Sequence, residues 1–171
     1  MKNNKEKRID NMGSDINNEV KLVFPTIELQ EQAIDFIADC DTSAGTCGLY
    51  EAIKADDYDS WINAVVAEMD IAKKKDGITP ALTYFYMREH DHKIIGIVKL
   101  KLVSGEIEFC VRKSERRKHN AINMVNDIRS MGALLGAATP VAILDKSRNY
   151  SQEETAAQVI VRLCGGKIIN D

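Results

Sequence analysis

The sequence contains no run of about 20 apolar residues, the length that a membrane-spanning helix needs. It also lacks the apolar segment near the N-terminus that marks a secretory signal. Its 23 lysine and arginine residues are outnumbered by 26 aspartates and glutamates, which gives a formal net charge of −3. An acidic balance argues against general nucleic-acid binding, which usually needs a basic domain. These absences predict a cytoplasmic protein that neither crosses a membrane nor has nucleic acid as its main partner.

Metal-binding and disulfide motifs are scarce as well. The chain has no Cys-x-x-Cys pair among its four cysteines, which are Cys40, Cys47, Cys110 and Cys164. Reduced thiols in a cytoplasm are the simplest interpretation. His90 and His92 flank Asp91 in a polar turn, but the sequence offers no obvious third and fourth ligand, so we expect no metal site there.

A chain of 171 residues with 44% hydrophobic content is long enough for one domain with a real core. Residues 1–19 carry little to bury and are expected to be a disordered leader. Residues 20–171 are expected to form a single α+β domain with a mixed sheet. Strands are predicted at 20–24, 81–88, 94–102, 106–111, 139–144 and from 167, and helices at 27–39, 57–73, 121–136 and 152–163.

The most informative stretch joins a strand to a helix through a basic turn. Residues 106–111 alternate in the period of a strand, and apolar residues recur at helical spacing from Ala121 onward. The unpaired N–H groups and the dipole of a helix N-terminus can hold a phosphate. Four cations add positive charge at this turn: Arg112, Arg116, Arg117 and Lys118. A basic, solvated helix start without a ligand is the alternative reading of this pattern.

This turn resembles the acyl-CoA pyrophosphate loop of the GNAT acetyltransferases, whose pattern is Arg/Gln-x-x-Gly-x-Gly/Ala. Residues 116–121 fill the six positions, with His119 in place of the first glycine. The resemblance extends to the stretches 22–26, 83–96 and 164–166. It implies a mostly antiparallel mixed sheet flanked by helices on both faces, and acetyl-CoA as the cosubstrate.

The resemblance also implies roles for individual residues. Glu106 and Glu108 share one face of the strand, and either could take the proton from an ammonium substrate before it attacks the thioester. The position four residues before Cys110 favours Glu106, while two solvated glutamates are the alternative. Cofactor contacts are expected from the backbone or side chains of Phe109, Cys110, Val111, Arg116, Arg117, Lys118, His119, Asn120, Ala121 and Asn149.

The predicted function is therefore N-acetylation of a small-molecule or protein amine with acetyl-CoA. The alternative is a catalytically inactive GNAT-like protein that binds acyl-CoA or a protein partner. His119 favours that alternative, as does a sequence that stops at Asp171, where the resembling proteins have one more strand. A sheet edge left open in this way would invite a second copy or a partner strand.

Overall fold

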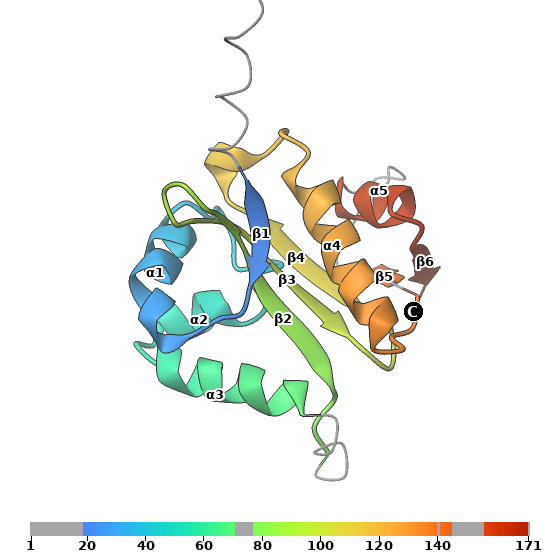
Figure 1. The fold of residues 1–171 in the computed structure, drawn as a ribbon, viewed down its shortest axis with the longest axis horizontal. Helices are drawn as coiled ribbons and strands as arrows, with labels where there is room; N and C mark the ends of the chain where they lie inside the picture. The colour runs from blue at the N-terminus through green and yellow to red at the C-terminus, as the bar shows by residue number, and fades with distance from the viewer. Residues whose placement is uncertain (1–18, 71–76, 140, 145–155, 171) are drawn as a thin grey trace, which may run out of the picture.

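The computed structural model describes residues 19–70, 77–139, 141–144 and 156–170 (Figure 1). Apart from Glu19, the predicted leader lies outside the described residues, as does the predicted cofactor ligand Asn149. The described part is a layered α+β arrangement with helices on both faces of a central sheet (Figure 1). This confirms the predicted fold class.

The strands form an antiparallel sheet of four and a separate parallel pair. Four strands pair antiparallel in the order β1-β2-β3-β4, and two further strands, β5 and β6, pair parallel. The sequence had predicted these strands to within about two residues at either end, from alternation at 106–111 and from turn residues and apolar runs elsewhere. The strands are β1 Val20–Val23, β2 Ala81–Arg88, β3 Lys93–Lys101, β4 Ile107–Val111, β5 Val141–Leu144 and β6 Lys167–Asn170.

Helices α1, α2 and α3 cover one face of the sheet, and α4 and α5 cover the other (Figure 1). The predicted helix over 27–39 begins as a 3-10 turn and continues as α1. Helix α2 was not predicted, because six residues are too few to show a helical period. The helices are α1 Gln30–Ala38, α2 Leu49–Lys54, α3 Tyr58–Met69, α4 Asn120–Leu134 and α5 Ala156–Leu163, with 3-10 turns at Ile27–Leu29 and Lys113–Glu115.

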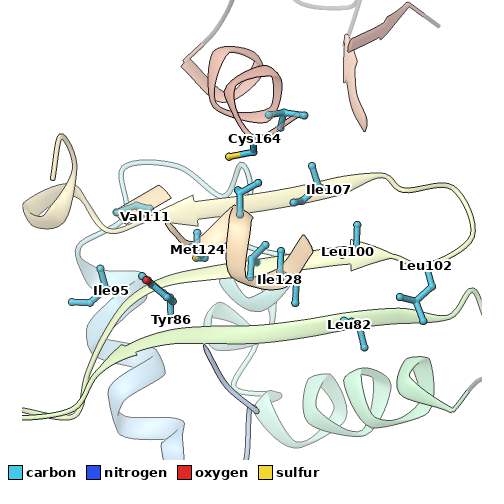
Figure 2. Packing of buried hydrophobic residues seen from close by; sticks show 13 residues of the cluster. Leu82, Tyr86, Ile95, Leu100, Leu102, Ile107, Val111, Met124, Ile128 and Cys164 are labelled. Carbon is cyan, nitrogen blue, oxygen red and sulfur yellow. The ribbon is translucent and has the colours of Figure 1, made fainter. Parts of the chain in front are cut away.

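Two apolar clusters hold these layers together. Figure 2 shows the cluster between the sheet and α4 and α5, in which Met124 and Ile128 of α4 are fully buried. On the other face Phe36 and Phe85 are also fully buried, and Trp61 stacks on Phe85 with 5.9 Å between ring centroids. Burying one such side chain contributes about 1.5–3 kcal/mol. The two clusters fix α4 and α1 on opposite sides of β4, which positions the site described next.

Strand β4 has an edge that is only partly covered. Glu106 bridges to Val141 of β5, and this is the point at which the two strands are bonded. On the β3 side, Lys101 N–H donates to the Glu106 carbonyl and Arg112 N–H to the Ile95 carbonyl. Since bonding direction alternates along an antiparallel strand, the backbone groups of the odd-numbered residues of β4 point to the other edge. There the described residues provide no paired strand beyond the bridge.

Candidate functional site

A cavity of about 520 Å³ lies beside this uncovered edge of β4. Pockets of 300–1,000 Å³ are typical of small-molecule and cofactor sites. Its wall combines β4, the turn before α4, the first turn of α4 and the start of α5. The lining residues are Ala44, Phe109, Cys110, Val111, Glu115, Arg116, Arg117, His119, Asn120, Ala121, Ile122, Ala156, Ala157 and Ile160.

Most of the predicted cofactor residues therefore meet around one cavity. Eight of the ten line it, from Phe109 to Val111 on the strand and from Arg116 to Ala121 in the turn, Lys118 excepted. Asn149 lies outside the described residues. Sequence reasoning missed six lining residues: Ala44, Glu115, Ile122, Ala156, Ala157 and Ile160. Nothing in the sequence pattern of the three α5 residues shows that α5 folds back toward β4.

The turn before α4 has an unusual backbone. Arg117 has φ 63° and His119 has φ 61°, and both lie in the left-handed region. A residue with a side chain pays about 1–2 kcal/mol of conformational energy in this region, whereas glycine adopts it without steric cost. His119 is the residue that caps α4, and it stands where the resembling loops have glycine. The turn thus keeps a shape that favours glycine although it carries an imidazole.

The N-terminus of α4 opens into the cavity. Asn120, Ala121 and Ile122 all line it, and they form the first turn of a 15-residue helix. The first N–H groups of a helix have no intrahelical partner and attract anions. The Asn120 side chain instead donates to the Glu115 carbonyl at 3.0 Å, which fastens the turn.

The expected group of four cations is only partly present, because one of them serves the fold. The Arg112 side chain is buried and forms ion pairs with Asp35 at 2.9 Å and Asp39 at 2.8 Å, which ties β4 to α1. Burial alone would raise the pKa of Asp39, but hydrogen bonds from Arg112 and Ser114 lower it to about 2. Arg112 is therefore a structural residue and not a phosphate ligand.

Two further cations are already paired with carboxylates. Arg116 pairs with Asp41 at 2.8 Å and donates from Nε to the Val111 carbonyl at 3.0 Å. Lys118 pairs with Glu115 at 3.0 Å and does not line the cavity. Arg117 is exposed, lines the cavity and forms no ion pair with any described residue. It is the cation of the turn that is best placed for an anionic ligand.

The two candidate bases lie on the α1–α3 side of β4. Glu106 pairs with Lys101 at 2.5 Å, near the bridge to β5. Glu108 is exposed, and its Oε1 accepts the Cys47 N–H at 3.0 Å. Neither is among the described residues that line the cavity, but both share a strand face with Cys110, which does. At about 3.3 Å per residue, Glu108 is about 7 Å along the strand from Cys110, and Glu106 is about 13 Å away.

A glycine-containing loop closes over β4 from the same side. Gly45 has φ 76°, and a Cβ built there would lie 2.1 Å from the Phe109 carbonyl oxygen. Only glycine fits so close an approach. Trp61 fixes the end of this loop, because its Nε1 donates to the Cys47 carbonyl at 2.9 Å. The loop brings Ala44 to the cavity, and its two glycines were the available sequence signal.

Neither a metal site nor a membrane-spanning helix is found in the described part of the chain. Its His, Cys, Asp and Glu side chains form no group of three or more that could hold a metal ion. None of its helices is long and apolar enough to cross a membrane.

Comparison with known proteins supports the architecture. No protein-family model matches the sequence, and no curated protein matches it significantly. Among solved structures, it is similar to a protein from Vibrio cholerae described as a ribosomal-protein-serine acetyltransferase. That match has a TM-score of 0.57 and 12% identity, and it covers 85% of this chain and 78% of the other.

A second similar structure is that of MccE, the microcin C7 self-immunity acetyltransferase, in complex with acetyl-CoA and AMP. It matches with a TM-score of 0.46 and 18% identity over 72% of this chain and 68% of the other. Identities this low speak for the fold and not for the substrate. The match to the Vibrio cholerae protein, together with a four-stranded antiparallel sheet flanked by helices, leads to one conclusion: the chain has a GNAT-like α+β fold.

Proposed function

We propose that the protein is an acetyl-CoA-dependent N-acetyltransferase that acts on an amine of a small molecule or a protein. The observation that carries the proposal is the cavity itself. It combines the edge of β4 at Phe109 and Val111, where no described strand pairs, with the N-terminus of α4. The strand edge suits an amide-containing chain such as pantetheine, and the helix N-terminus suits a pyrophosphate.

Binding would divide between these two parts of the cavity. The amides at the start of α4 and the Arg117 guanidinium would hold the phosphates, because both present donors to an anion. The backbone of β4 would pair with the amides of the pantetheine arm. Arg116 stands between the two parts, since its Nε already occupies the Val111 carbonyl. That carbonyl accepts a further hydrogen bond only through its second lone pair or after Arg116 moves.

The proton of the incoming amine would pass to a carboxylate on the α1–α3 side. Resemblance favours Glu106, but position along the strand favours Glu108, which is closer to Cys110. Its hydrogen bond from the Cys47 N–H fixes one oxygen and leaves the other for the substrate or a bridging water. We therefore propose Glu108 as the first candidate for the base and keep Glu106 as the second.

A catalytically inactive acyl-CoA-binding protein is the alternative, and specific contacts favour it. Arg116 is tied to Asp41 and Val111, His119 crowds the turn, and Glu106 is held by Lys101. Such a protein would bind acetyl-CoA without turning it over. The two functions therefore share the cavity and differ in the role of the carboxylates.

Calorimetric titration with acetyl-CoA tests the shared claim. We expect binding by the wild type, and Arg117→Ala should weaken it about tenfold, because a charge-assisted contact to phosphate is lost. Lys113→Ala is the matched control: Lys113 lies in the adjoining 3-10 turn, is exposed and does not line the cavity. Acetyl-CoA at 100 times its dissociation constant should also stabilise the fold by about 2.7 kcal/mol.

The absence of heat and of a thermal shift at millimolar acetyl-CoA would refute the proposal. Equal weakening by the Arg117 and Lys113 variants would show that any cation near the turn contributes, and would remove Arg117 as a specific ligand.

A further inference from the structure

Two cysteines from distant parts of the chain meet at the wall of the cavity. Cys40 follows the end of α1, and Cys110 lies on β4. Their sulfur atoms are 3.9 Å apart, within reach of an S–H···S hydrogen bond. Cys110 lines the cavity, and Cys40 is partly exposed to solvent. All four cysteines are free thiols in this structure.

The other two cysteines point elsewhere. The Cys47 sulfur contacts the carbonyls of Gly45 and Glu108, and the Cys164 sulfur contacts the Ile122 carbonyl on the far side of β4. The chain thus contains one close thiol pair together with natural reference thiols in the same fold.

The surroundings of the pair shift the pKa values of the two thiols in opposite directions. The hydrogen bond between the two thiols lowers the pKa of Cys110, and the nearby Arg116 guanidinium lowers it further, against the effect of burial. The same hydrogen bond, together with burial, raises the pKa of Cys40. Cys110 is thereby the more acidic thiol of the pair, and Cys40 is the less acidic one. A thiolate next to a thiol is the arrangement that reacts with oxidants.

We propose that Cys40 and Cys110 form a reversible disulfide when the protein meets a hydroperoxide. Cys110, as its thiolate, attacks the terminal peroxide oxygen and the O–O bond breaks. The alkoxide that leaves (hydroxide in the case of hydrogen peroxide) takes up the proton that the thiol gave up and becomes an alcohol or water. The resulting sulfenic acid is attacked by the Cys40 sulfur, which forms the S–S bond and releases the sulfenic oxygen as water. Both sulfurs are oxidised and the peroxide is reduced. A dithiol reductant reverses the step by exchange.

The geometry allows this closure with a modest movement. A disulfide needs about 2.05 Å between the sulfurs, so the pair must approach by roughly 2 Å. Cys40 lies beyond the last residue of α1, and Cys110 lies on a strand with one uncovered edge. Closure would draw β4 toward α1 and distort the wall formed by Phe109 and Val111. If the cavity holds acetyl-CoA as proposed above, oxidation should weaken that binding.

The direct test is mass spectrometry of the full-length protein after mild hydrogen peroxide treatment. We expect the loss of two hydrogen atoms per chain and a tryptic cross-link between the Cys40 and Cys110 peptides, both reversed by dithiothreitol. Cys40→Ser and Cys110→Ser should abolish the cross-link, whereas Cys47→Ser and Cys164→Ser should retain it. This readout does not depend on the proposed function.

A second readout tests the consequence for the cavity. Oxidised wild type should bind acetyl-CoA at least tenfold more weakly than reduced wild type, and Cys110→Ser, which lacks the thiol that reacts with peroxide first, should bind equally before and after peroxide. Wild type that keeps four titratable thiols while its methionines oxidise would overturn the proposal. A cross-link through Cys47 instead of Cys40 would overturn it too.

Discussion

At the scale of single residues, His119 gives the sharpest prediction. Replacing it with glycine removes a side chain from a left-handed position, so His119→Gly should stabilise the fold by about 1 kcal/mol. It should also tighten acetyl-CoA binding about tenfold, or 1.4 kcal/mol, because the side chain crowds the approach of the pyrophosphate. Thermal unfolding and calorimetry measure the two effects.

A neighbouring residue provides the control for this change. Lys118→Gly alters the same turn at a position that is not left-handed, so it should lower stability. A different outcome for His119→Gly, weaker acetyl-CoA binding at both pH 6 and pH 8, would refute the crowding argument and make His119 a phosphate ligand.

The two carboxylates of β4 can be separated by substitution. Glu108→Gln should lower turnover by roughly 10²–10⁴-fold, because the amide cannot take a proton. Its oxygen can still accept the Cys47 N–H, so the fold and the acetyl-CoA affinity should hold. Glu106→Gln is the comparison and should cost less. These turnover measurements need a known acceptor amine. A larger loss in Glu106→Gln would make Glu106 the base, and unchanged turnover in both variants would exclude both carboxylates as the base.

At the scale of elements, the junction between α1 and β4 depends on the ion pairs of the buried Arg112 side chain with Asp35 and Asp39. Hydrogen bonds from Arg112 and Ser114 lower the pKa of Asp39 to about 2 from its ordinary 3.8, although burial acts the other way. The stabilisation from a lowered carboxyl pKa is complete above the unfolded value and is lost as pH falls through the folded value. This junction should therefore weaken between about pH 4 and pH 2.

Unfolding measured across this range tests the network. After a discount for solvent exposure, Asp39→Asn should remove about 1 kcal/mol of the stability lost between pH 4 and pH 2. Asp59→Asn, an exposed residue without an ion pair among the described residues, is the control. An unchanged acid profile for Asp39→Asn would show that Asp35 alone holds Arg112.

The elements themselves show what sequence periodicity can predict. Strand 106–111 was predicted to within a residue of its observed bounds, because apolar and polar residues alternate there. Strand 81–88 was predicted at its observed bounds from the proline before it and the polar turn after it, since its mostly buried residues show no alternation. Helix α2 has no such period. The partners of Arg112 and Arg116 were out of reach, because Asp35, Asp39 and Asp41 are more than 70 positions away and their approach depends on how α1 packs.

At the scale of the whole molecule, one cavity brings together the strand and the turn that the resemblance to GNAT proteins predicted as cofactor contacts. The strand at Phe109 and the turn at Ala121 were expected to act together, and both line it. Only the structure shows that α5 and the loop at Ala44 also line the cavity. In the described part of the chain, β6 pairs only with β5, so a partner strand or a second copy at its other edge stays a prediction.

Hydrogen exchange with and without acetyl-CoA tests the central claim most directly, because it locates the ligand on the chain. We predict slower exchange for the amides of residues 107–122 and 156–163, with no change in α3, which lies away from the cavity. Unchanged exchange at these residues under saturating acetyl-CoA, or protection confined to α3, would contradict the assignment of the cavity as the acyl-CoA site.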